Sequence, residues 1–294
     1  MASAHPSLKT SFRKQQTLAK PSTFSGIGIH TGTEVKMRFV PAEENSGILF
    51  KRTDLPGQPF IPATIEYVCD TARSTTIGIG NMKIHTVEHV LAAVAAYQID
   101  NLIIEVSSIE PPIGNGSSDV FVNMIENAGI QQQDSEKAVI HLQEPLYWSE
   151  GDIHIFSIPS DEYRISYTLN YPETKALRAQ FHSLVLTPES FKREISPCRT
   201  FSLFEEVSML MDYGLIKGGS LDNAVIIKED AIFSKNGLFF PDEMCRHKIL
   251  DLIGDLFLVG FDFRAHLIAV RSGHASNNAF AKKLYNHITM ENCE

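Results

Sequence analysis

The chain has 294 residues, of which 43% are hydrophobic and 21% are charged, and its formal charge is -9; this length suggests two globular domains. The acidic balance argues against a nucleic-acid binder, which needs a local excess of Lys and Arg. Four scattered cysteines without a C-x-x-C pair are typical of free thiols in a reducing compartment, and no apolar run approaches the roughly 18 residues of a membrane span. We expect a soluble, cytoplasmic protein.

The N-terminal segment is basic. Lys9, Arg13, Lys14 and Lys20 occur there without an acidic residue, but the apolar centre of a secretory signal is missing. We expect residues 1–20 to form an extended or partly disordered tail, and a transit-like leader is the alternative.

The first half of the chain is expected to be rich in short strands. β-branched and aliphatic residues crowd together between Gly and Pro residues in four segments, at 35–40, 47–51, 75–79 and 101–106. The apolar spacing becomes helical over 86–97. A second helix is predicted over 118–128, where serines are placed to cap its start.

The second half is expected to begin after a polar linker at 132–137. Further strands are predicted at 138–142, 153–158, 163–169 and 266–270. A helix is predicted over 243–259, and a loop at 271–276 is expected to precede a final helix that ends near residue 288.

The two halves share a pattern around two histidines. His89 and His247 each open a predicted helix that is followed by a strand and a loop. Asn115 follows the first histidine by 26 residues, His274 follows the second by 27, and a phenylalanine comes six residues later in both halves. This predicts an α+β fold of two similar domains, 14–131 and 138–294, each a strand-rich unit with two helices. Chance agreement of two helix-strand-helix units is the alternative.

The segments around these histidines suggest a metal site. His247 and Asp251 stand four residues apart, which places their Cβ atoms about 5 to 6 Å apart on one helix face; a plain surface pair is the alternative. Glu88 and His89 are adjacent, so one can bind a metal while the other lies beside the open coordination position. Zinc with three protein ligands keeps such a position for water and needs a nearby carboxylate for proton transfer.

His85 allows a different interpretation. The motif His85-Thr86-Val87-Glu88-His89 also matches the H-x-x-E-H signature of inverzincin metallopeptidases, in which His85 and His89 would be the ligands. The internal repeat favours the other set, because it places His89 opposite His247 and completes a His, His, Asp group without His85. In that case His85 is a solvated residue at the helix start.

A further histidine lies on a predicted loop. His274 stands in a Ser-Gly-His-Ala segment before the last helix. A neighbouring carboxylate could keep it protonated as a general acid, and Asp255, one turn beyond Asp251, is the candidate partner. Capping of the last helix is the alternative role.

Taken together, these segments resemble the UDP-3-O-acyl-N-acetylglucosamine deacetylase family, the zinc enzymes of bacterial lipid A synthesis. The resemblance extends over about residues 24–285. The segments that carry it are 25–32, 52–54, 86–89, 100–101, 112–117, 198–201, 218–220, 247–251, 254–256, 272–275 and 277–278. Two departures occur: Asn115 stands where the family usually has Asp, and the preceding sequence reads Glu110-Pro111-Pro112.

The resemblance implies a role for each matching residue. Zn²⁺ would be held by His89, His247 and Asp251, with Glu88 as the base and His274 as the acid. The other implied residues are Thr200 for the oxyanion, Lys248 for substrate contact, Phe201 beside the sugar, Asn170, Tyr171 and Arg271 near the nucleotide, and Leu203 to Leu221 along a passage for the acyl chain.

The implied fold is a β-α-α-β sandwich, in which the helices of the two domains pack together between the sheets. The implied reaction removes the N-acetyl group of UDP-3-O-acyl-N-acetylglucosamine and releases acetate. The family resemblance also implies a monomer in the bacterial cytoplasm, with transient contact with a membrane surface allowed. A non-catalytic sugar-nucleotide or lipid-binding protein is the rival, but binding alone needs no base beside an open metal site.

Overall fold

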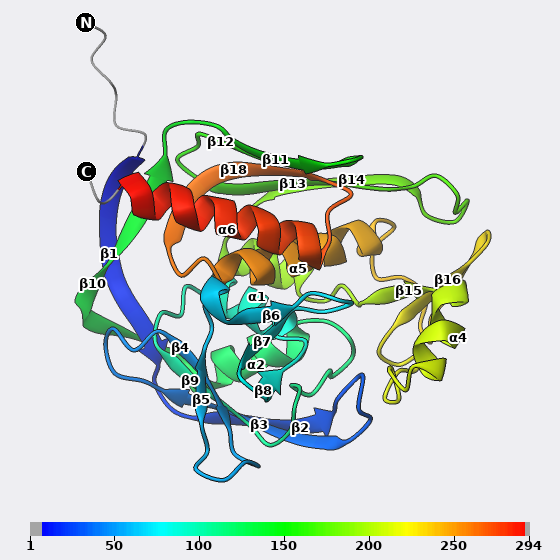
Figure 1. Ribbon diagram of the computed structural model, residues 1–294, viewed down its shortest axis with the longest axis horizontal. Helices are drawn as coiled ribbons and strands as arrows, with labels where there is room; N and C mark the ends of the chain where they lie inside the picture. Colours follow the sequence, from blue (N-terminus) through cyan, green and yellow to red (C-terminus); the bar gives the residue numbers. More distant parts are fainter. Residues whose placement is uncertain (1–7, 292–294) are drawn as a thin grey trace, which may run out of the picture.

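The computed structural model describes residues 8–291, and its main elements form four layers (Figure 1). A sheet lies on each outer side, and two helices line the inner face of each sheet. The helices are α1 (Glu88–Ala96), α2 (Asp119–Ala128), α3 (Pro188–Ser190), α4 (Phe204–Asp212), α5 (Glu243–Phe257) and α6 (His274–Glu291). The predicted α+β class, with helices between two sheets, is confirmed.

The first sheet has the strand order β2-β3-β9-β4-β5. Its strands are β2 (Ser22–Ile27), β3 (Glu34–Pro41), β4 (Ile48–Arg52), β5 (Phe60–Pro62) and β9 (Leu102–Val106). Strand β3 shows why this segment forms a half-buried strand: Val35, Met37 and Phe39 are buried, while the residues between them are exposed. This period of two places one face against α1 and α2.

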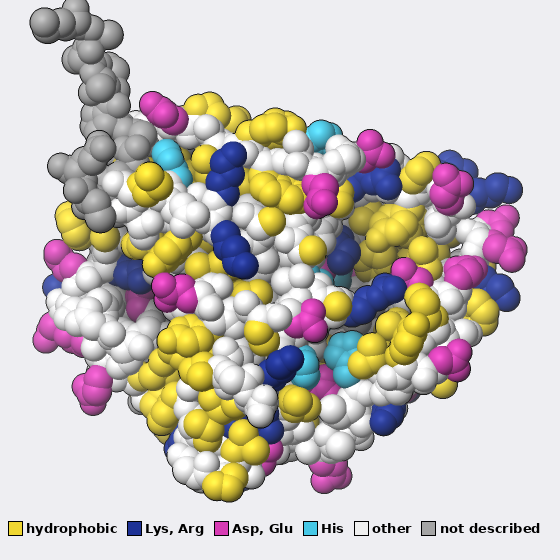
Figure 2. All heavy atoms as spheres, viewed as in Figure 1, with side chains coloured by type: hydrophobic (Ala, Val, Ile, Leu, Met, Phe, Trp, Pro, Cys, Tyr) yellow, Lys and Arg dark blue, Asp and Glu magenta, His cyan; other side chains and the backbone are white. Residues whose placement is uncertain are grey.

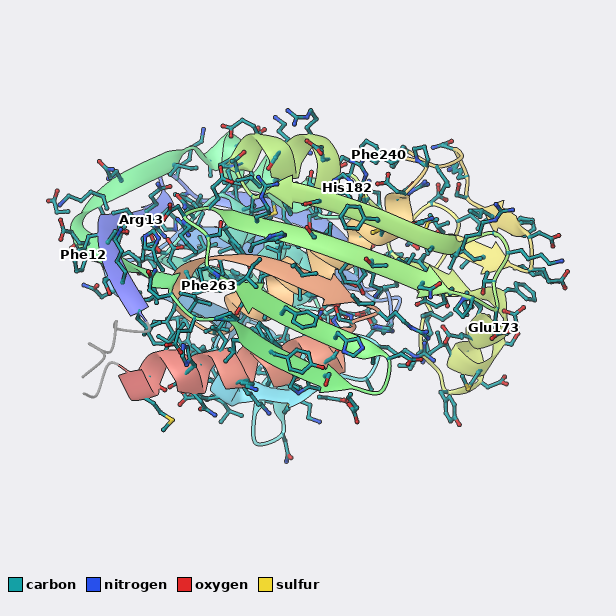
Figure 3. All side chains as sticks on the ribbon, turned by 90° about the horizontal axis from the view of Figure 1, so that it is seen from above. Phe12, Arg13, Glu173, His182, Phe240 and Phe263 are labelled. Atoms are coloured by element: carbon teal, nitrogen blue, oxygen red, sulfur yellow. The ribbon has the colours of Figure 1, made fainter. Side chains whose placement is uncertain are left out.

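The second sheet contains the order β11-β12-β18-β13-β14, seen face-on in Figure 3. Its strands are β11 (Leu146–Glu150), β12 (Ile153–Ile158), β13 (Tyr163–Tyr171), β14 (Arg178–Val185) and β18 (Asp262–Val270). Strand β18 alternates buried and half-buried residues over its whole length. On the inner face of the sheet, α5 packs against β13 and β14, and α6 packs against β11 and β12.

The strand pairing of the two sheets matches. Strand β9 lies between antiparallel β3 and parallel β4, and β18 lies between antiparallel β12 and parallel β13. Antiparallel partners extend both sheets at each side, β2 and β5 in the first and β11 and β14 in the second. Phe121 of α2 and Phe280 of α6 are both buried. The predicted repeat is therefore present in the topology.

Two sequence expectations about the connecting segments are wrong. The expected tail includes a long strand, β1 (Leu8–Leu18), and the expected linker at 132–137 lies inside another, β10 (Ile130–Leu142). The two strands pair antiparallel with each other, and β10 continues the second sheet beside β18. The prediction failed because it treated the polar side chains of these strands as solvated, whereas several of them form hydrogen bonds with neighbouring segments. Residues 1–7 of the expected tail lie outside the described residues.

Arg13 on β1 shows how these polar side chains are used. Its guanidinium donates to both carboxylate oxygens of Asp100 at 2.7 and 2.9 Å, and to Asp262 at 2.6 Å. Figure 3 labels Arg13 and Phe263 at this end of the sheet. The ion pairs therefore join the N-terminal strand to both halves of the molecule.

Smaller elements complete the fold. One three-stranded sheet consists of β6 (Val68–Asp70), β7 (Thr76–Ile79) and β8 (Met82–Ile84), and another of β15 (Phe201–Leu203), β16 (Val225–Lys228) and β17 (Ala231–Phe233). The second of these and α4 form an insert at one side of the molecule (Figure 1). A 3-10 turn covers Ile65–Tyr67 and a π-helical turn Phe191–Ile195. None of the helices within residues 8–291 is long and apolar enough to cross a membrane.

Candidate metal centre and active-site cavity

A cavity of about 760 Å³ is lined by both domains and by the insert. Ligand sites favour such clefts between domains, and the volume is in their usual range. Figure 2 shows histidine, basic and hydrophobic side chains gathered beside α4. The cavity therefore combines groups suited to chemistry with an apolar wall.

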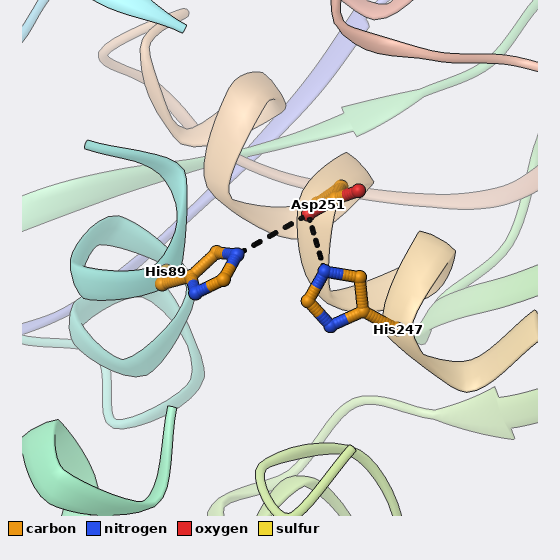
Figure 4. Close-up of side chains that lie close together, drawn as sticks. All are labelled: His89, His247 and Asp251. Carbon is orange, nitrogen blue, oxygen red and sulfur yellow. Dashed lines mark ion pairs between the residues drawn. The ribbon is translucent and has the colours of Figure 1, made fainter. Parts of the chain in front are cut away.

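Three buried side chains in this cavity form a group that can hold a metal ion. His89, His247 and Asp251 each offer a ligand atom, and these atoms lie within 4.8 Å of one another (Figure 4). Asp251 Oδ1 is 3.7 Å from His89 Nε2 and 3.3 Å from His247 Nε2. The two imidazole rings meet edge to face, with 4.9 Å between their centres.

The packing of α5 on α1 brings the group together. His89 is the second residue of α1, and His247 and Asp251 lie one turn apart on α5. Gly254, one turn further on, allows the two helices to approach closely: a Cβ atom there would lie 2.1 Å from the Glu88 carbonyl oxygen. A side chain at this position would force the helices apart.

The surroundings of these three residues fit a cation. His247 Nδ1 lies 3.0 Å from the Cys198 carbonyl and donates to it, which leaves the Nε2 lone pair facing Asp251. Asp251 Oδ1 is buried without a hydrogen-bond partner among residues 8–291. A buried carboxylate oxygen facing imidazole lone pairs is unfavourable unless a positive charge lies between them.

The charge states of the three side chains agree with this. Burial and the neighbouring His247 lower the pKa of His89 to about 3, so its imidazole is neutral near pH 7. Burial alone would raise the pKa of Asp251, but the Lys248 ammonium, 2.8 Å away, holds it well below its usual range. The group thus presents two imidazoles, of which that of His89 is neutral, and one carboxylate, a typical zinc set.

Glu88 lies beside this group and is almost fully buried. Its Oε2 accepts a hydrogen bond from the Thr75 backbone N–H at 3.0 Å, and its Oε1 is 3.8 Å from His274 Nε2. Burial raises the pKa of its carboxyl to about 8; the His274 charge opposes this shift, and Asp255 and Asp251 add to it. A carboxyl that titrates near neutral pH is suited to proton transfer.

His274 approaches the same space from α6. Its Nδ1 lies 2.9 Å from Asp255 Oδ2, and its Nε2 faces Glu88 and, at 4.0 Å, Asp251. Asn277 also donates to Asp255 Oδ2, at 2.9 Å. Burial disfavours the imidazolium, but the carboxylates of Asp255 and Glu88 raise the pKa of His274 to about 9. The expected loop at 271–276 is partly wrong, because α6 already begins at His274.

Six other residues singled out from the sequence border the cavity: Thr200, Phe201, Leu203, Lys248, Tyr171 and Arg271. Lys248 Nζ lies 5.5 Å from the centre of the Phe201 ring. Asn170 is not among the described residues that line the cavity. Neighbouring residues of a strand point to opposite faces, so Tyr171 turns toward the cavity and Asn170 away from it.

The insert supplies the apolar part of the wall. The apolar side chains within 203–221 that line the cavity are Leu203, Val207, Leu210, Met211, Leu215, Ile216 and Leu221. Leu210 is the buried residue of α4, whereas several of its neighbours are exposed. Much of the segment therefore faces the cavity or solvent, and only part of it is helix core.

His85 and Asn115 lie outside the candidate metal group. His85 Nδ1 is 2.7 Å from the hydroxyl of Thr76, and burial lowers the pKa of its imidazole. Asn115 accepts hydrogen bonds from the backbone and hydroxyl of Ser117 at the start of α2. The expected serine cap is not formed: Ser118 is the N-cap residue of α2, but its hydroxyl donates to the His89 carbonyl instead of accepting from the helix backbone. The Ser117 hydroxyl accepts from the backbone N–H of Asp119, the first residue of the helix.

Sequence reasoning missed two groups that the structure places at the site. Thr75 bonds to both buried carboxylates, and the Cys198 carbonyl orients His247. Thr75 lies 180 residues from Asp255 and Cys198 lies 49 residues from His247, so no local spacing could have indicated these two contacts. Cys198, Cys69 and Cys245 carry free thiols, and Cys293 lies outside the described residues.

A carboxyl that can take a proton and a histidine that can give one lie on either side of a candidate metal group, an arrangement that suits an enzyme that hydrolyses amides. Residues 15–286 match the family model of UDP-3-O-acyl N-acetylglycosamine deacetylase, and the chain belongs to this family.

Curated relatives carry the name UDP-3-O-acyl-N-acetylglucosamine deacetylase. The chain is 50% identical to the relative from Chlamydia pneumoniae over 273 residues, which cover 92% of this chain and 97% of that protein. Identity is again 50% over 272 residues with the Chlamydia felis relative, at the same coverage. It is 46% over 272 residues with a relative from Chlamydia trachomatis serovar L2, with coverage of 92% and 95%.

Proposed function

We propose that this enzyme uses one zinc ion to hydrolyse the N-acetyl group of UDP-3-O-acyl-N-acetylglucosamine in the bacterial cytoplasm, as an early step of lipid A synthesis. The names of the relatives support the substrate. The observation that carries the zinc requirement is the buried Asp251 Oδ1, which faces His89 and His247 without a hydrogen-bond partner among residues 8–291.

His89, His247 and Asp251 would hold the metal. Zinc bound there would supply Lewis acidity, lower the pKa of water toward about 7, and favour the ionised form of Glu88, whose pKa is raised mainly by burial. Glu88 takes the proton of the water whose oxygen attacks the acetamide carbon. The Thr200 hydroxyl donates to the oxyanion that forms.

The second half of the reaction uses His274. The bond between the carbonyl carbon and the nitrogen breaks, and His274 Nε2 gives its proton to the leaving amine. Asp255 keeps the imidazolium oriented through Nδ1, at 2.9 Å. The products are acetate and the free amine of the sugar.

The cavity wall suggests how the rest of the substrate lies. The leucines, Val207 and Met211 of the insert suit the acyl chain, whose burial contributes about 0.8 kcal/mol per CH₂ group. Phe201 would flank the sugar beside Lys248. Tyr171 and Arg271, at the end of the second sheet, would contact the nucleotide.

The two rival functions are less well supported. A metallopeptidase of the H-x-x-E-H type would need His85 as a metal ligand. The His85 imidazole instead forms a hydrogen bond with the Thr76 hydroxyl and lies outside the candidate metal group, and the chain belongs to a deacetylase family. A purely binding protein would not need Glu88 and His274 on either side of that group.

Metal analysis coupled to an acetate-release assay tests the proposal. We expect about one zinc per chain and stoichiometric acetate from the UDP-linked substrate. Glu88→Ala should lower kcat by about 100- to 10,000-fold with zinc content unchanged. Glu66→Ala, which removes an exposed glutamate, is the control. Full turnover by Glu88→Ala, or no acetate from the zinc-loaded wild type, would refute the assignment.

A further inference from the structure

Thr75 lies where three helices of the two domains meet. It is fully buried just before β7. Its backbone N–H donates to Glu88 Oε2 at 3.0 Å, and its hydroxyl donates to Asp255 Oδ1 at 2.5 Å. The same hydroxyl accepts from Asn278 Nδ2 of α6 at 3.1 Å. One residue of the first domain therefore forms hydrogen bonds with side chains on α1, α5 and α6.

The bond to Asp255 has consequences for His274. Asp255 Oδ2 is used by His274 and Asn277, and the Thr75 hydroxyl is the hydrogen-bond partner of Oδ1 within residues 8–291. Both oxygens are therefore held, which fixes the rotation of the carboxylate and the plane of the imidazole that bonds to it. Without the hydroxyl, a fully buried carboxylate oxygen would lose its partner and the carboxylate would turn to find another.

We propose that Thr75 is a positioning residue for the reaction. Its backbone holds the Glu88 carboxylate, and its hydroxyl sets the Asp255–His274 pair so that His274 Nε2 faces the cavity. A residue that acts in this way affects turnover more than substrate binding, because neither Thr75 group lines the cavity. This inference rests on the proposed roles of Glu88 and His274.

The neighbouring residue offers a matched control. Thr76 is also buried, and its hydroxyl also has a side-chain partner, His85 Nδ1 at 2.7 Å. It lies on the other face of the strand, and neither it nor His85 lines the cavity. Thr76→Val thus removes a buried hydroxyl in the same strand without touching Asp255.

The test compares steady-state acetate release by zinc-loaded wild type, Thr75→Val, Thr75→Ser and Thr76→Val. We expect Thr75→Val to lower kcat by about 10- to 100-fold, the usual cost of losing an outer-shell partner, with KM and zinc content within about twofold of wild type. Thr75→Ser keeps the hydroxyl and should recover most of kcat. Thr76→Val should keep kcat near the wild-type value.

Other results would overturn the inference. Equal kcat losses in Thr75→Val and Thr76→Val would show a general effect on packing, and wild-type kcat in Thr75→Val would show that the hydroxyl is not needed. If Thr75→Val does not fold, Thr75→Ala takes its place and must have a lower kcat than Thr75→Ser. Equal kcat values for Thr75→Ala and Thr75→Ser would reject the proposal. Failure of the proposed function appears differently, because then the zinc-loaded wild type itself releases no acetate.

Discussion

The contact between Gly254 and the Glu88 backbone predicts that Gly254→Ala disturbs the metal site from a distance. The added Cβ would lie 2.1 Å from the Glu88 carbonyl oxygen and 2.7 Å from its carbonyl carbon. Real Cβ atoms essentially never come closer than 3.0 Å to such atoms, so α1 and α5 must separate by about 1 Å. Because His89 is on α1 and Asp251 on α5, their 3.7 Å separation would grow by a similar amount.

The expected cost has two opposing parts. Overpacking of this kind costs about 1–3 kcal/mol, and more where backbone must move. Alanine in a helix interior recovers up to about 1 kcal/mol relative to glycine. We therefore expect a net loss of about 2 kcal/mol of stability. Displacement of a ligand by about 1 Å should also weaken zinc binding by 10-fold or more.

Thermal unfolding of the metal-free protein and zinc titration with a competing chelator measure both effects. Gly273→Ala is the control, because it adds the same methyl group near the metal group, in the cavity wall, with no atom within 4 Å of the new Cβ. It should leave the Tm and the zinc affinity near the wild-type values. A Gly254→Ala protein with wild-type Tm and zinc affinity would refute the argument that close packing of α1 on α5 sets the site.

Three further predictions concern other contacts. Asp255→Asn removes the carboxylate that raises the pKa of His274 to about 9, so an NMR titration of His274 in the metal-free protein should give a lower pKa; an unchanged value would contradict the pairing. Arg13→Ala leaves Asp100 and Asp262 without their shared partner, so it should lower the free energy of unfolding, measured in urea, by about 3 kcal/mol. The control is Arg38→Ala, which removes a half-exposed ion pair and should lower this free energy by less than about 1 kcal/mol. Leu210→Ala in the cavity wall should lower kcat/KM for an acylated substrate by about 10-fold and leave kcat/KM for the analogue without the acyl chain unchanged. Equal losses of kcat/KM for the two compounds would show that the acyl chain binds elsewhere.

The sequence predicted those parts of the site that depend on short-range spacing. The four-residue step from His247 to Asp251 places both on one helix face, and the adjacency of Glu88 and His89 separates their directions, whatever the rest of the chain does. For the same reason, the sequence predicted strands whose burial alternates with a period of two, such as β3 and β18. It also predicted the repeat around the two histidines.

The tertiary structure decided which distant residues meet. Whether His85 or His247 lies beside His89 depends on how α5 packs on α1, and the close contact at Gly254 lets α5 bring His247 there. Strands β1 and β10 look like solvated polar segments until each is paired with the other. Thr75 reaches Asp255 across 180 residues of chain. Hydrogen bonds and packing between remote segments leave no periodic pattern in the sequence, because each partner is chosen by the folded arrangement and not by its neighbours along the chain.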